Sequence, residues 1–157
     1  KTLSKVNLKI LTNKKNNMEK KYKILNKFIK DMSIETNNIQ TYLFVKDIIS
    51  RYHLTIAINS KAIKNQMIEI DTNLKLEDKE GNEHRSNFEI VFCTVIKLTD
   101  ENIDKKELQK ILLVEVQNEI YPDLEKSLLN VIHNSGFGEF KISKKIDFLE
   151  LYNKQFS

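Results

Sequence analysis

Hydrophobic and polar residues alternate in four stretches within the first hundred residues, and this period of two is typical of β-strands that bury one face. The predicted strands are 22–35, 52–59, 67–78 and 87–99. The segment Asp78-Lys79-Glu80-Gly81-Asn82 has the composition of a turn, so we predict that the last two strands form an antiparallel hairpin. Residues 40–50 fit either a loop or a short helix.

The first predicted strand ends in a clear alternation. It places Phe28, Met32 and Ile34 on one side and Ile29, Asp31, Ser33 and Glu35 on the other.

The fourth strand is unusual because it is apolar on both faces. One face carries Phe88, Ile90, Phe92, Ile96 and Leu98, and the other carries Val91, Cys93 and Val95. Water cannot lie against either face of such a strand without exposing apolar surface. We therefore expect a helix, another subunit or a bound protein to cover the second face.

The period changes to that of a helix from residue 104. A first helical stretch is expected to be interrupted at Tyr121-Pro122, and a second begins at Asp123 and ends at Asn134-Ser135-Gly136. An exposed apolar connector, 137–142, then leads to a short helix over 147–155. Strands followed by helices predict an α+β fold, with a four-stranded antiparallel sheet, a long helix and a short C-terminal helix.

Composition indicates one soluble domain preceded by a basic tail. The chain has 157 residues, of which 40% are hydrophobic and 31% charged. Residues 1–17 carry five lysines and no acid; without them, 21 basic and 22 acidic residues remain, so the net charge falls from +4 to −1. We predict a disordered tail over 1–17 and one domain over 18–157. The near-neutral domain has no basic stripe and predicts no nucleic-acid partner.

The sequence also predicts a cytoplasmic protein that does not insert into membranes. No apolar stretch approaches the roughly 20 residues of a membrane-spanning helix, and the first residues lack the apolar core of a secretory signal. A single cysteine, Cys93, permits no intrachain disulfide.

The reactive residue types favour binding over catalysis. His53, His84 and His133 have no metal-ligand spacing, and Cys93 lies in an apolar run, where a thiol is usually inert. The three glycines form no phosphate-binding loop, so we expect no nucleotide site. We predict no catalytic residue, no metal and no cofactor.

Five segments resemble the SecB family of protein-export chaperones. In chain order they are Phe28-Ile29-Lys30-Asp31-Met32-Ser33-Ile34-Glu35, Phe44-Val45-Lys46-Asp47, Ile120-Tyr121-Pro122, Asn134-Ser135-Gly136-Phe137 and Ile146-Asp147-Phe148. Each is short, but together they follow the family's order and nearly its spacing over about residues 22–155. The chain departs from the family at Phe92-Cys93-Thr94, where Leu-Cys-Glu is common, and at Asp123-Leu124-Glu125-Lys126, where Tyr-Ala-Arg-Glu is usual. It therefore resembles a divergent member.

This resemblance implies a homotetramer, a dimer of dimers, that holds unfolded preproteins on apolar grooves and passes them to the translocase motor SecA. Candidate client-binding residues are the apolar positions of the fourth strand and the connector: Ile90, Phe92, Ile96, Phe137, Phe140 and Ile142. The alternative is that these six belong to the core or to a subunit interface.

Two acids match those that SecB-like proteins use towards SecA. Asp31 and Glu35 share one face of the first strand, and the alternative for both is an ordinary solvated surface. The absence of a carboxylate at Thr94 is expected to remove one charge from this acidic surface. Two other functions fit the same residues: a SecB-like chaperone dedicated to one partner, such as an antitoxin, and an adaptor domain that binds a folded partner.

Overall fold

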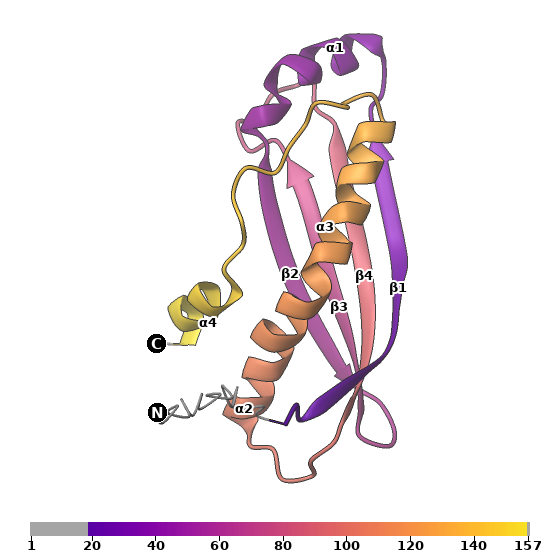
Figure 1. Cartoon of the computed structure of the whole chain (residues 1–157). Helices are drawn as coiled ribbons and strands as arrows, with labels where there is room; N and C mark the ends of the chain where they lie inside the picture. Colours follow the sequence, from indigo (N-terminus) through magenta and orange to yellow (C-terminus); the bar gives the residue numbers. More distant parts are fainter. Residues whose placement is uncertain (1–18, 157) are drawn as a thin grey trace, which may run out of the picture.

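A four-stranded antiparallel sheet covered by one long helix forms the body of the computed structural model, which describes residues 19–156 (Figure 1). The strands are β1 (Tyr22–Glu35), β2 (His53–Ala62), β3 (Met67–Glu77) and β4 (Asn87–Leu98), in the spatial order β1-β4-β3-β2. The four predicted strands, the β3–β4 hairpin and the α+β class are confirmed. The predicted tail, 1–17, lies outside the described residues.

The two central strands bury one face of the sheet, which we call the inner face. Register pairs Leu74 of β3 with Ile90 of β4, and Thr72 with Phe92, and all four side chains are buried beneath the long helix. The opposite, outer face has no helix against it within residues 19–156. Neighbouring side chains give it partial cover, so that Cys93 is only 1% exposed.

The alternation predicted for β1 is wrong, because the pairing of this strand with β4 contains two register shifts. The pairing with β4 slips within residues 24–26 and again within 29–31. A bulge adds one residue to a strand and so reverses the faces of the residues beyond it. Phe28 therefore shares the outer face with Asp31, whereas Ile29 and Met32 lie on the inner side.

The long helix consists of three consecutive segments: α2 (Lys105–Lys110), a π-helical segment η2 (Ile111–Glu115) and α3 (Val116–Asn134). The predicted interruption at Pro122 is wrong, because α3 continues through it. Pro122 and Asn118, whose carbonyl lacks the usual proline N–H partner, are both exposed, so water can solvate that carbonyl. Asp123 begins no helix; its carboxylate lies 2.6 Å from Lys27 Nζ of β1.

A buried amide fixes the long helix on the sheet. Gln117, which is 0% exposed, accepts a hydrogen bond from Thr72 Oγ1 at 3.0 Å and donates one to the Leu112 carbonyl at 3.1 Å. Losing a buried partner is costly, so the bond from Thr72 defines the position of the helix along β3, while the bond to Leu112, within the long helix itself, holds the amide in place. The apolar stripe of α3 continues the contact with Ile120, Leu124, Leu128 and Ile132.

Smaller helices occupy the two ends of the molecule. Residues 39–51 are helical, as α1 (Ile39–Ile48) and a short 3-10 turn η1 (Ile49–Arg51), and the Asn38 side chain caps α1 by accepting from Thr41 N at 2.8 Å. The last helix, α4 (Phe148–Phe156), packs Phe148 and Tyr152 near Val114. No helix in the described part of the chain is long and apolar enough to cross a membrane.

The long helix ends as predicted, at Asn134-Ser135-Gly136. Gly136 has a φ of +99°, a conformation that side chains disfavour. A Cβ at this position would lie 2.7 Å from Cε2 of Tyr42 in α1, and the Tyr42 hydroxyl donates to the Gly136 carbonyl at 2.8 Å. Glycine is therefore required both by the backbone and by the close approach of α1.

Replacing Gly136 by alanine should lower the free energy of unfolding by about 2 kcal/mol, through backbone strain and the contact with Tyr42. The matched control is Gly138→Ala, because a Cβ at Gly138 meets nothing within 4 Å. Urea unfolding of all three proteins at one concentration measures the difference. Equal stability of Gly136→Ala and Gly138→Ala would contradict this account of the helix end.

Candidate functional site

An apolar groove lies between β2 and the segment that joins α3 to α4, residues 135–147, which contains the predicted connector and is called the connector from here on. It has a volume of about 550 Å³. Its apolar lining comes from three regions of the chain: Tyr52, Leu54, Ile56 and Leu76 from the sheet and its approach, Phe140, Ile142 and Ile146 from the connector, and Leu151 from α4. Most of these side chains are half-buried, so their apolar surface is only partly covered by the fold.

The groove exists because the long helix crosses the sheet diagonally, and the end of α3 lies away from the first residues of β2 (Figure 1). Leu54 and Ile56 pair with Leu76 and Leu74 of β3, so they point to the inner face of the sheet. The connector and α4 both supply residues beside this part of β2. In the described structure, no backbone hydrogen bond joins residues 141–147 to β2. Side-chain contacts alone set the width of the groove.

The start of the connector is held firmly. The Phe137 ring is 3% exposed and makes an edge contact with Phe88, with ring centroids 5.5 Å apart. The His133 ring nitrogen Nε2 is hydrogen-bonded to the Phe140 carbonyl at 2.8 Å. Phe137 is thus an anchor, and the expectation that it contacts clients is corrected. Phe140 and Ile142 are half-buried and line the groove.

The structure also corrects the expectation for the fourth strand. Ile90, Phe92 and Ile96 are 0%, 6% and 0% exposed on the inner face. Side chains in the core cannot reach another protein while the chain is folded, so the alternative of a core role applies to all three. Of the six residues predicted to bind clients, the groove brings together two, Phe140 and Ile142.

The predicted acidic surface lies on the outer face of the sheet. Asp31 and Glu35 are both exposed there. Glu89 of β4 lies between them, opposite Ser33. Thr94 is fully buried on the inner face, so the lack of a carboxylate at this position takes no charge from the acidic surface.

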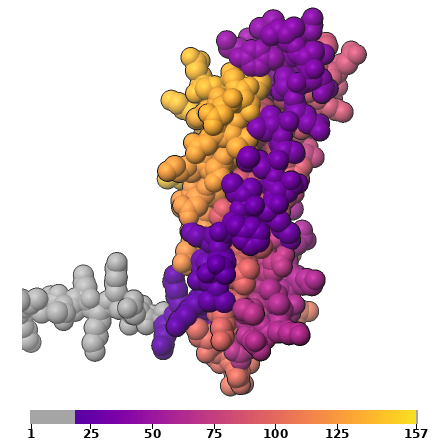
Figure 2. All heavy atoms as spheres, turned by 90° about the vertical axis from the view of Figure 1, so that its right-hand side faces the viewer, coloured from indigo at the N-terminus to yellow at the C-terminus, as the bar shows by residue number. Residues whose placement is uncertain are grey.

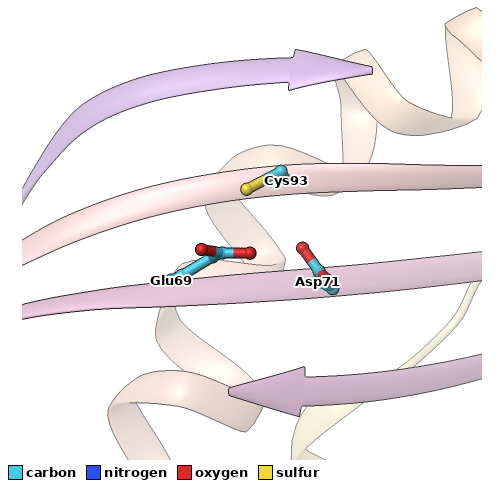
Figure 3. A group of neighbouring side chains, drawn as sticks. All are labelled: Glu69, Asp71 and Cys93. Atoms are coloured by element: carbon cyan, nitrogen blue, oxygen red, sulfur yellow. The ribbon is translucent and has the colours of Figure 1, made fainter. Parts of the chain in front are cut away.

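Three potential metal ligands meet elsewhere on the outer face. Ligand atoms of Glu69, Asp71 and Cys93 lie within 4.8 Å of one another (Figure 3). However, Lys30 Nζ of β1 is 2.7 Å from both carboxylates and supplies the positive charge between them. Burial, followed by the hydrogen bond to Asp71, raises the pKa of Cys93 to about 11. The thiol is therefore protonated at neutral pH and is a poor nucleophile or ligand.

The free edge of β1 is the second apolar surface. Four large side chains along it are between 44% and 50% exposed: Leu25, Phe28, Ile29 and Met32. The edge runs along much of the molecule without cover from the described residues (Figure 2). A long apolar edge strand is a ready site for pairing with another chain. The sequence analysis did not predict this surface, because the alternation of residues within β1 does not show that the strand lies at the edge of the sheet, with β4 on one side only.

Comparison with known proteins identifies one consistent set of relatives. A family model described as preprotein translocase subunit SecB matches residues 15–157. A protein-export protein SecB of Pelagibacter ubique (strain HTCC1062) is 48% identical over 138 residues, which are 88% of this chain and 99% of the relative. The protein-export protein SecB of a Bradyrhizobium species (strain BTAi1) is 23% identical over 131 residues, covering 83% of this chain and 79% of the relative.

A solved structure shares the fold. A SecB-like chaperone of Mycobacterium tuberculosis, determined in complex with a peptide from the HigA1 antitoxin, superposes with a TM-score of 0.56. The alignment covers 80% of this chain and 91% of that one, at 9% sequence identity. At this identity the likeness concerns the fold alone.

Proposed function

The chain belongs to the SecB family of protein-export chaperones, and on that premise we propose that it is an ATP-independent holdase for unfolded preproteins. Proteins of this family are chaperones and not enzymes. The observation that carries the proposal is the open apolar groove between β2 and the connector. We place this activity in the cytoplasm, where preproteins are held before export.

The groove has the physical properties that holding requires. Its half-buried apolar side chains gain burial only when another chain covers them, and complete burial of one large apolar side chain contributes roughly 1.5–3 kcal/mol. Because no backbone bonds fasten the connector to β2, the groove can adjust to side chains of different size. Binding of this kind rests on apolar burial and needs no nucleotide.

Replacing Phe140 and Ile142 together by serine should weaken client holding several-fold, because both side chains line the groove. Light scattering from an aggregating unfolded protein measures the effect. The matched control replaces Ile39 and Leu43, two exposed apolar residues of α1, by serine. Equal protection by the two double variants, with both correctly folded, would remove the groove from the proposal.

We further propose that the protein forms a homotetramer, a dimer of dimers. The exposed apolar edge of β1 supports this, because monomeric proteins seldom leave a long apolar edge strand unpaired. Light scattering coupled to gel filtration should give four times the chain mass of 18.5 kDa at micromolar concentration.

Phe28→Lys with Met32→Lys should shift the protein to smaller species, because two charges then lie at the β1 edge. Ile63→Lys, at the exposed β2–β3 turn, is the control and should leave the mass unchanged. A monomeric parent protein at micromolar concentration would refute the proposed assembly.

Asp31 and Glu35 are proposed to contact SecA, since both carboxylates are exposed on the outer face. Exposed charge contacts are screened by salt, so titration of labelled SecA should show binding that weakens from low to moderate salt. Asp31→Lys with Glu35→Lys should lower the affinity further, and Lys64→Glu should leave it largely intact. If the double reversal binds as well as the parent, these acids form only a solvated surface.

A chaperone dedicated to one partner is the second candidate function. The likeness to a SecB-like chaperone that was solved with an antitoxin peptide favours it, because the same groove could serve a single client. One protein that copurifies stoichiometrically, with no protection of unrelated unfolded proteins, would support this function over general holding. A tetramer that delays no aggregation and retains only folded partners would instead indicate an adaptor.

A further inference from the structure

The free edge of β1 can pair with any extended segment that presents one apolar side. Within residues 19–156, β1 pairs with β4 only, so the backbone groups along its other side have no strand partner. The apolar side chains that line this edge, among them Phe28, Ile29 and Met32, are about half exposed. Proteins rarely leave such an edge uncovered. A second copy is one candidate to cover it, and the same chain offers another.

The segment that precedes β1 has the hydrophobic pattern of a strand. Val6, Leu8 and Ile10 alternate with polar residues, two of which are Lys5 and Lys9. An extended backbone would therefore place the three apolar side chains on one face. Residues 12–21 join this segment to β1 and include three asparagines, a residue type that favours turns. Consecutive strands joined by a short connection commonly pair as an antiparallel hairpin.

The chain enters β1 from a fixed position. Lys20 Nζ lies 2.8 Å from the carboxylate of Glu119, and Lys21 Nζ lies 2.6 Å from that of Glu107, both on the long helix. The Lys21 carbonyl also accepts a hydrogen bond from the backbone N–H of Thr99 at 2.9 Å. These contacts hold the start of β1 at one end of the sheet. A segment that folds back from this point would run antiparallel to β1.

The charges of the two segments are complementary. Asp31 and Glu35 are exposed on the outer face, and no lysine or arginine in the described part of the chain forms an ion pair with either. Lys30 beside them is already paired with two acids of β3. If the apolar face of the preceding segment lies on the inner side, Lys5 and Lys9 lie on the outer side with these free carboxylates. Such cross-strand pairs of opposite charge each stabilise a sheet weakly.

We propose that residues 3–11 add to the free edge of β1 as a fifth, antiparallel strand, and that they compete with a second copy of the chain for this edge. By themselves these residues are expected to be disordered, and they gain order only on the edge. A short linker gives a tethered segment an effective concentration in the millimolar range. A second copy offers a longer strand and displaces the segment at sufficient concentration. The segment thus regulates assembly, and the inference is independent of client holding.

A fluorophore on the segment tests whether it is held. Ser4→Cys provides one reactive thiol, because Cys93 is 1% exposed. At concentrations too low for assembly, the dye in the full chain should show high fluorescence anisotropy. Leu8→Ser with Ile10→Ser should lower the anisotropy towards that of a labelled peptide of residues 1–17. The matched control, Leu3→Ser with Leu11→Ser, removes the same atoms from the other face of the segment and should retain most of the anisotropy.

A dilution series followed by light scattering tests the competition. Leu8→Ser with Ile10→Ser should lower the midpoint concentration of assembly by roughly threefold to tenfold, because the second copy no longer has to displace the segment. Leu3→Ser with Leu11→Ser should leave the midpoint close to that of the parent. An anisotropy or a midpoint that Leu8→Ser with Ile10→Ser does not change would overturn the proposal.

Two further variants locate the segment. Phe28→Lys with Met32→Lys should release the dye, because both changes lie at the β1 edge. Release by Phe140→Ser with Ile142→Ser instead would place the segment in the groove and overturn its assignment to β1. A parent protein that is monomeric at every concentration, with the dye still held at β1, would refute the proposed tetramer and support the fifth strand.

Discussion

One helix covers one face of a four-stranded sheet, and the exposed apolar surfaces of this chain follow from that constraint. A helix with its side chains is about 10–12 Å wide, whereas strands lie roughly 4.8 Å apart, so four strands extend beyond the cover that one helix provides. The long helix lies over the central strands β3 and β4, with Gln117 bonded to Thr72 at its contact with β3. Each edge strand is consequently left with apolar surface that the helix does not cover.

The two uncovered regions differ in their surroundings and therefore in what they can bind. Along β1, the strand edge itself is free and carries apolar side chains such as Met32 on the inner side, which suits pairing with another folded copy. Along β2, the connector supplies a second wall, so the apolar surface lies in a groove rather than at an edge. A groove with one wall held only by side chains suits an extended, variable chain. One packing constraint thus supports both proposed assembly and proposed holding.

The sequence predicted the elements of this fold well, because each has a local cause. Alternation identified the strands, and Gly136 identified the end of the long helix. The faces of β1 were not predictable, because the bulge within 29–31 has no glycine or proline to signal it. The continuity of the helix through Pro122 was equally hidden, since it depends on the proline lying on the solvent side.

Burial of the apolar residues could not be assigned from the sequence either. Phe137 and Phe140 lie three residues apart in one apolar connector, yet only Phe137 is enclosed, because Tyr42 from distant α1 and Phe88 from β4 surround its ring. The apolar run of β4 resembled a binding surface, but in a four-stranded sheet the most apolar strand belongs in the centre. Contacts between distant segments decide which apolar residues are left for another protein.

Hydrogen exchange of the free protein and of its complex with an unfolded client tests the central claim most directly. The account predicts that the client slows exchange in β2 and in residues 138–147, which border the groove, while the amides of central β4 remain unchanged. Slowed exchange confined to other surfaces, with β2 and the connector unaffected by the client, would contradict it.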